Sequence, residues 1–235
     1  MIATIHQPDF MPWLGFYSKI AKSDIWVILD HVENNPRHKG YWNRVAILVQ
    51  ENFFWISTTI DKKNYAGRGG IPINEMKISD IEKKLYLKKI KTFEESYKKA
   101  PYFREALSLF ENYYLSTEMS LAKRNINFIL KTFKLLNIKI KIINSSSIEI
   151  NTRSTQLLLD ILKKVGADTY LHGSGAFEYQ DDSLLINNGI NLKANNFVHP
   201  IYKQISNKNF VQGLSVIDAI ANIGTSALSK IILSK

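Results

Sequence analysis

The chain has no cysteine among its 235 residues. Disulfide bonds, thiolate metal ligands and a cysteine nucleophile are therefore excluded. The sequence also has no run of the ~18 apolar residues that a membrane-spanning helix needs. No basic segment followed by an apolar one marks a signal peptide at the N-terminus. We therefore expect no transmembrane segment and a cytoplasmic location.

Standard nucleotide-binding and metal-binding motifs are missing as well. Neither a Walker A loop nor G-x-G-x-x-G occurs, and no G-x-S-x-G marks a serine nucleophile. No two histidines stand at a metal-binding spacing such as H-x-x-x-H; the five are His6, His31, His38, His172 and His199. We predict that the protein holds no metal and no bound cofactor.

Acidic residues are scarce relative to basic ones, so the formal net charge is +10. One interpretation is an acidic partner, such as an anionic membrane, a nucleotide-linked substrate or an acidic carrier protein. The other is that lysines concentrated in 83–99 and 131–141 solvate helix surfaces. No nucleic-acid-binding motif accompanies the charge, so we expect no nucleic-acid partner.

The distribution of apolar residues predicts an α/β fold. Apolar or alternating runs predict strands at 2–5, 25–29, 45–49, 53–60, 138–143 and 169–171, with a turn at 50–52. Helical spacing predicts a helix at 13–21, a helical block at about 79–136 that starts with a capping box of Ser79 and Glu82, and a helix capped by Ser154 that ends at Gly166. The strand–helix–strand order of 138–172 requires parallel strands. We predict a single Rossmann-like α/β domain over 1–235, with a mixed or parallel sheet and a helical insertion.

Polar residues follow the first strand directly, where His6-Gln7-Pro8 breaks the apolar run. In open α/β sheets, ligands bind beyond the carboxyl ends of the strands. A histidine there suits a general base near neutral pH, and Gln7 suits the orientation of a substrate amide or hydroxyl. The alternative is that His6 caps the strand and bonds only to the backbone.

Two further strand ends carry candidate residues. Asp30 follows the second strand, where it could orient His6 or bind a sugar hydroxyl; its alternative role is a cap or turn. His172-Gly173-Ser174 follows the strand at 169–171, and its backbone amides could bind an anion; the alternative is a flexible turn. We expect His6, Asp30 and His172 to line one cleft, with all three and Gln7 as catalytic candidates and Gly173 and Ser174 as substrate-binding candidates.

Trp42-Asn43-Arg44 places a stacking surface, an amide and a fixed cation together. Arginine suits bidentate binding of a carboxylate or phosphate, although a lone arginine entering a strand often makes only a surface salt bridge. The other substrate-binding candidates flank the strand ends or the closing segment of the chain: Asp9, Trp13, Lys19, His199 and Tyr202.

The segment from His6 to Ile20 resembles the opening of the WbqC-like family. Ser23-Asp24, Val27 to Asp30 and Trp42-Asn43-Arg44 resemble that family too, as do the later segments His199-Pro200-Ile201-Tyr202 and Leu214 to Asp218. The resemblance implies a bacterial role in decorating sugars of surface polysaccharides, such as O-antigen and lipopolysaccharide, or of antibiotics. It also implies an activity, the transfer of glycine or a related acyl group to an amino sugar.

Together these observations favour an acyl or aminoacyl transferase that acts on the amine of a nucleotide-linked or lipid-linked amino sugar. The acyl donor would be a thioester of coenzyme A or of an acidic acyl carrier protein, whose contacts would be Lys62, Lys63 and Arg68. One alternative is a nucleotidyltransferase-like enzyme acting on a phosphate-bearing substrate. Another is a non-catalytic sugar-binding or scaffolding protein.

Overall fold

A five-stranded sheet, parallel throughout, forms the centre of the computed structural model, which describes residues 1–35, 40–65, 68–173, 180–205 and 209–234. Its spatial order is β7-β2-β1-β8-β9. The strands are β1 (Ile2–His6), β2 (Ile25–Ile28), β7 (Lys141–Asn144), β8 (Thr169–His172) and β9 (Asn191–Ala194). The predicted α/β fold is confirmed, and the sheet is parallel rather than mixed.

The strand order reverses its direction between β1 and β8. In chain order, β2 and β7 are added on one side of β1, and β8 and β9 are then added on its other side. Crevices that bind ligands form at such a reversal, beyond the carboxyl ends of the strands. In this sheet the two residues at that point are His6, which ends β1, and His172, which ends β8.

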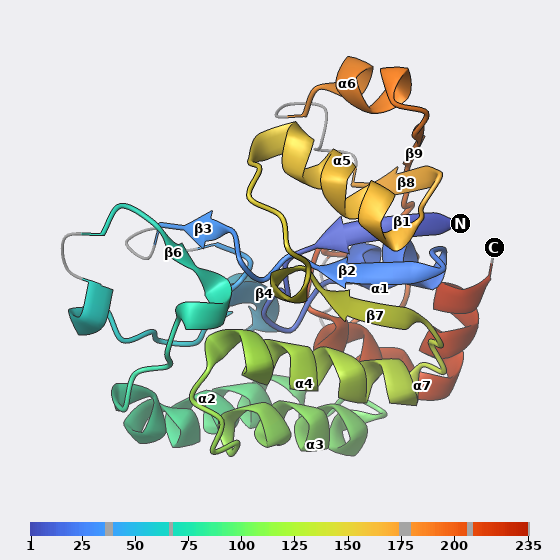
Figure 1. The fold of residues 1–235 in the computed structure, drawn as a ribbon. Helices are drawn as coiled ribbons and strands as arrows, with labels where there is room; N and C mark the ends of the chain where they lie inside the picture. The colour runs from blue at the N-terminus through green and yellow to red at the C-terminus, as the bar shows by residue number, and fades with distance from the viewer. Residues whose placement is uncertain (36–39, 66–67, 174–179, 206–208, 235) are drawn as a thin grey trace.

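Helices cover both faces of the sheet (Figure 1). One face packs on α5 (Ser154–Val165) and α6 (Asp182–Asn187), and the other packs on α1 (Leu14–Ala21) and α7 (Val216–Leu233). Strand alternation divides the side chains between the two cores. Ala3 and Ile5 of β1 belong to the α5 core, so His6 lies on the α1 face.

The predicted helical block consists of α2 (Ile81–Tyr97), α3 (Phe103–Tyr114) and α4 (Leu121–Leu135). Phe93 of α2 stacks on Phe110 of α3 with ring centroids 4.4 Å apart, and this contact extends the core beneath the sheet. The predicted capping box is wrong. Instead of reaching back to Ser79, the buried Glu82 carboxylate accepts the Thr59 N–H at 2.8 Å and pairs with Lys89.

Two small antiparallel ladders lie beside the central sheet. β4 (Arg44–Val49) and β5 (Asn52–Ser57) form a hairpin, and β3 (Glu33–Asn34) pairs with β6 (Ile71–Pro72). Gln50 and Glu51 both have positive φ, as a tight two-residue hairpin turn requires, so the turn is one residue shorter than predicted. Short 3-10 turns are η1 (Lys63–Tyr65), η2 (Ile73–Glu75) and η3 (Ser145–Ser147).

Two predicted boundaries are wrong for local reasons. The strand predicted at 138–143 begins at Lys141, because Asn137 adopts a left-handed conformation and the Ile138 N–H bonds back to the Phe133 carbonyl at 2.9 Å. Ser154 does not cap α5: it is the first residue of that helix, after Arg153. Gly166 ends α5 in the left-handed conformation, as predicted.

Helix α7 is long and apolar enough to cross a membrane by length and composition alone, although 61% of it is buried inside the protein. Gly224 interrupts its helical geometry with a φ of +76°. The Tyr102 ring would lie 2.7 Å from a Cβ at this position. The kink therefore requires glycine for two reasons, the positive φ and the close approach of this ring.

Candidate functional site

A pocket of about 350 Å³ lies beside the carboxyl end of β1. Four segments supply its walls: the end of β1, the first turns of α1, the residue after β8 and the stretch that follows β9. The lining residues are His6, Trp13, Gly15, Phe16, Lys19, Gly173, Asn195, Asn196, Phe197 and Val198. The pocket therefore lies at the reversal of strand order, where an α/β sheet is expected to bind its ligand.

His6 presents a neutral imidazole to this pocket. Its Nδ1 lies 3.0 Å from the Gln7 carbonyl oxygen, which only accepts, so Nδ1 carries the proton and Nε2 keeps the lone pair. The ring packs edge-on against Phe16 at 5.1 Å. Burial, with a smaller contribution from the charge of Lys19, lowers the pKa of His6 to about 3. The ring is thus neutral throughout the physiological range.

Asp9 is a carboxylate that lies beside His6. Its Oδ2 lies 3.7 Å from His6 Nδ1, and no hydrogen bond to the carboxylate comes from any residue that the structure describes. Burial raises the pKa of Asp9 to about 7, against the opposing effect of the Lys19 charge. A carboxyl group that titrates near neutrality therefore stands next to the imidazole.

Lys19 reaches the same pocket from α1, one turn beyond Phe16. It is only 4% exposed, and burial lowers the pKa of its ammonium group to about 8, although Asp9 acts in the opposite direction. Within the described parts of the chain, its ammonium group has neither a hydrogen bond nor an ion pair. His6, Asp9 and Lys19 thus form one group of titratable side chains that influence one another beside the pocket.

Aromatic and amide side chains complete the pocket. Trp13 is 37% exposed and meets Phe197 edge-on, with ring centroids 5.4 Å apart. The indole lies so close to α1 that a Cβ at Gly15 would come within 2.3 Å of it. Asn195 fixes the opposite wall, because its amide donates to the Gly15 carbonyl at 3.2 Å and its oxygen accepts from Lys22 at 3.4 Å.

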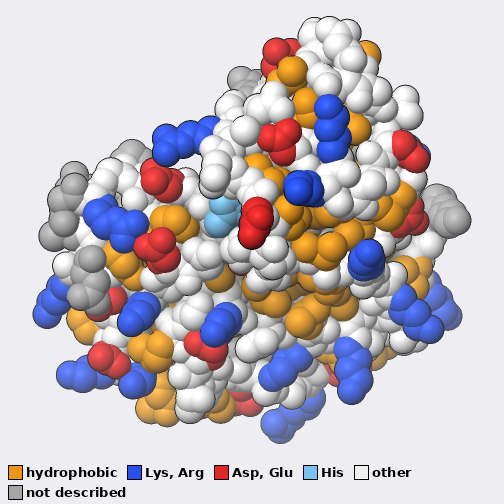
Figure 2. Space-filling view, viewed as in Figure 1, with side chains coloured by type: hydrophobic (Ala, Val, Ile, Leu, Met, Phe, Trp, Pro, Cys, Tyr) orange, Lys and Arg blue, Asp and Glu red, His pale blue; other side chains and the backbone are white. Residues whose placement is uncertain are grey.

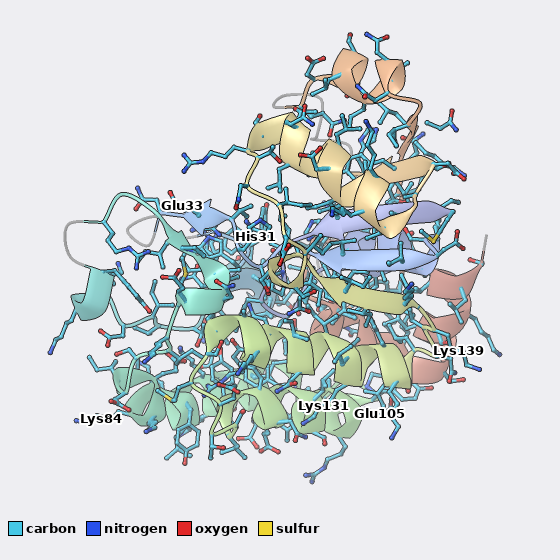
Figure 3. All side chains as sticks on the ribbon, viewed as in Figure 1. His31, Glu33, Lys84, Glu105, Lys131 and Lys139 are labelled. Atoms are coloured by element: carbon cyan, nitrogen blue, oxygen red, sulfur yellow. The ribbon has the colours of Figure 1, made fainter. Side chains whose placement is uncertain are left out.

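The prediction that Asp30 orients His6 is wrong. The Asp30 carboxylate accepts hydrogen bonds from Asn144 Nδ2 (3.1 Å), Ser145 Oγ (3.1 Å), Ser146 N (2.9 Å) and Ser146 Oγ (2.7 Å). These bonds tie the end of β2 to the turn after β7. Figure 3 shows His31 beside the same turn, where its Nδ1 lies 2.6 Å from Ser145 Oγ.

His172 is buried and lies on the opposite face of the sheet from His6. Tyr170 packs in the α5 core, and His172, two residues later on β8, shares its face with a ring separation of 5.8 Å. The prediction that His6, Asp30 and His172 line one cleft is therefore wrong. Gly173 does line the pocket, whereas Ser174 falls outside the described residues.

The predicted Trp42-Asn43-Arg44 surface does not form. Trp42 is 6% exposed and packs in a satellite core with Ile60 and Ile71, so it offers no stacking surface. Buried Asn43 bonds to the Gly40 N–H and the Thr58 carbonyl. The Arg44 guanidinium lies 4.4 Å from the Trp55 ring, and none of the three predicted residues lines the pocket.

His199 and Tyr202 lie next to the pocket wall rather than in it. The Tyr202 hydroxyl donates to the buried Asp218 carboxylate at 2.7 Å, which also accepts from Tyr97 (2.9 Å) and from Gln204 (3.1 Å). His199 is surrounded by the rings of Phe197, Tyr202 and Phe210. Burial raises the pKa of Asp218. This network anchors to α7 the segment whose earlier residues line the pocket.

Sequence reasoning missed Asn195, Asn196 and Phe197. The signal that would have found them is the one that found His6: a polar pair directly after a short strand of the sheet, here β9. It was missed because β9 ends at Ala194, inside a stretch of alternating residues that continues to Val198, so the sequence does not mark the end of the strand.

The remaining charged features lie elsewhere. A larger groove, of about 970 Å³, is lined by Lys88 and Lys91 of α2, by Lys99 just beyond that helix and by Lys203, but these lysines are exposed. Arg68 pairs with Glu75 at 3.0 Å. On the face of the molecule drawn in Figure 2, Lys and Arg side chains are dispersed rather than gathered in one patch. Over the described residues, no three histidine or acidic side chains come together as a metal site would need.

Comparison with known proteins agrees with the extent of the resemblance. The sequence model of the WbqC-like protein family matches residues 7–230. The uncharacterized protein Rv1507c of Mycobacterium tuberculosis is 25% identical over 230 residues, which cover 95% of this chain and 94% of that protein. No solved structure matches the chain. Because the match extends from the His6 loop to the end of α7, the chain belongs to the WbqC-like protein family.

Proposed function

We propose that this protein is an acyl or aminoacyl transferase that acts on the amine of a nucleotide-linked or lipid-linked amino sugar. The observation that carries the proposal is the neutral His6 imidazole, which lines the pocket with Asp9 3.7 Å from its Nδ1. A histidine whose Nδ1 side faces a carboxylate is the arrangement in which Nε2 serves as a general base. Asp9 takes the positioning role that the sequence had suggested for Asp30.

In the proposed reaction, the sugar amine attacks the carbonyl carbon of a thioester. A carbon–nitrogen bond forms, the carbon–sulfur bond breaks, and the sulfur leaves as a thiolate. His6 Nε2 takes the proton from the attacking nitrogen and then delivers it to the thiolate. The low pKa of His6 favours release of the proton to the leaving group but disfavours its uptake from the amine. The Asp9 carboxylate would offset that cost, because it stabilises the imidazolium that exists between the two transfers.

Two features of the pocket support a sugar as acceptor. Trp13 and Phe197 supply apolar ring surfaces at the wall, while Asn196 supplies a carboxamide that can bind a hydroxyl group. The pocket volume of about 350 Å³ lies at the small end of ligand pockets. It suits one sugar ring with its acyl group, so that the nucleotide or lipid would extend outside.

The test is intact-mass analysis of candidate amino sugars after incubation with thioester donors. We expect His6→Asn to lower turnover by roughly 10²-fold or more, the usual contribution of a general base. His31→Asn is the matched control, since His31 bonds to Ser145 outside the pocket, and it should stay within a few-fold of wild type. If wild type modifies no amino sugar, or if both variants lose activity equally, the proposal fails.

A further inference from the structure

We infer that the pocket beside His6 binds a substrate through a negatively charged group, a carboxylate or a phosphate, that contacts the Lys19 ammonium. The inference rests on the proposed function only in that it concerns the same pocket. It adds the kind of substrate group that Lys19 contacts, which the proposed reaction leaves open, since neither of the two reacting groups, the amine and the thioester, is itself anionic.

The first argument is that Lys19 lacks the partners that two other shielded cations have, the half-buried Lys89 and the buried Arg124. The Lys89 ammonium pairs with Glu82 and donates to the Ser57 carbonyl at 2.6 Å. The Arg124 guanidinium donates to the carbonyl oxygens of Ser116 and Glu118. Lys19 is as deeply buried as Arg124, at 4% exposure, but makes no such bond within the described part of the protein.

An unpaired buried charge is costly, because burial removes the water that would solvate it. Asp9 does not fill the place of a counter-ion. Its carboxylate lies beyond ion-pair distance of Lys19, and its pKa of about 7 leaves it partly protonated at neutral pH. An anion bound in the pocket would therefore stabilise the ammonium group by supplying the missing counter-ion.

The second argument is that other hydrogen-bond donors around the pocket are unused. Asn196, Gly173 and Val198 line the pocket, and among the described residues no acceptor bonds to the Asn196 carboxamide or to the backbone N–H groups of the other two. A cation together with several free donors suits a group with two or more anionic oxygens. Lys19 would supply the charge, and the amides would select the orientation.

The test measures binding of two simple anions, inorganic phosphate and acetate, by isothermal titration calorimetry at constant ionic strength with chloride as the reference ion. We expect the wild-type protein to bind at least one of them at a saturable site. Lys19→Met should weaken that binding at least tenfold. Lys123→Met, which removes an exposed lysine from α4, is the matched control and should leave the binding unchanged.

Phosphate binding alone would assign the charge to a phosphate of the substrate, and acetate binding alone would assign it to a carboxylate. Equal affinity in wild type and Lys19→Met, or no binding of either anion beyond chloride, would overturn the inference. Lys19→Gln serves the same comparison if the methionine variant does not fold. This titration does not depend on acyl transfer. If the protein binds the anion through Lys19 but the intact-mass experiment finds no acyl transfer, the proposed function fails and this inference stands.

Discussion

Asp9→Asn should stabilise the protein, and more so at higher pH. The substitution keeps the shape of the side chain and removes a carboxylate that burial disfavours. Burial raises the pKa of Asp9 from 3.8 to about 7. The native state therefore binds more protons than the unfolded state between these two values. Wild-type stability falls as pH rises through that window, and the loss is complete above about pH 7.

The magnitude follows from the size of the shift. About three pKa units correspond to about 4 kcal/mol in the free energy of unfolding, which is the ceiling for the gain at about pH 8.5. At about pH 5 the same shift corresponds to only about 1.5 kcal/mol, because the native carboxyl group is still protonated there. The measured gains should lie below these ceilings, because the Asp9 charge also favours the charged form of Lys19.

The assay is urea denaturation of wild type and variant at about pH 5 and about pH 8.5, at one ionic strength, with linear extrapolation to water. The pKa of His6 is lowered, so its contribution to stability rises with pH in the acid range, opposite to that of Asp9. The difference in free energy of unfolding between wild type and variant is therefore compared at each pH, rather than the pH profile of either protein alone. Asp80→Asn is the control: its exposed carboxylate pairs with Lys83 at the surface and should contribute less than about 1 kcal/mol. A gain that is the same at both pH values, or a loss at high pH, would refute the reasoning.

Two further predictions concern metals and the acyl donor. Because the sequence lacks metal-ligand spacings, dialysis against a chelator should leave transferase activity unchanged, whereas a loss that zinc or magnesium restores would point to chemistry centred on a phosphate. If an acidic carrier protein delivers the acyl group, raising the salt concentration should lower kcat/KM for the carrier-bound donor much more than for a small thioester, since exposed charges are screened beyond ~8–10 Å. Reversing the charges of Lys62 and Lys63 should have the same effect. If salt and charge reversal lower kcat/KM equally for both donors, the hypothesis of a carrier-protein donor is wrong.

The sequence was sufficient for features that depend on local order. The apolar run before His6 predicted β1, and the helical pattern after Trp13 predicted α1. Because a loop at the carboxyl end of a parallel strand lies at the ligand-binding edge, His6, Trp13 and Lys19 could be named before the structure, and all three line the pocket.

The sequence was insufficient where pairing between distant segments decides the outcome. Asp30 bonds to residues more than 110 positions away, and no local sequence pattern predicts these partners. Whether His172 shares a face with His6 depends on the register of β1 with β8, because a shift of one residue exchanges the two faces. The burial of Trp42 likewise depends on a satellite core built from Ile60, Ile71 and Leu121.

The central position of β1 has a consequence for the biosynthesis of this protein. The Thr4 hydroxyl bonds to the Leu171 carbonyl, which is 167 positions further along the chain. At 5–20 residues per second, a ribosome needs roughly 8–33 s to add those residues. Throughout that interval one edge of β1 has no neighbour, so the nascent chain carries an uncovered strand edge during most of its translation. His6, which lines the pocket, thus ends a strand whose second neighbour is synthesised only near the end of translation.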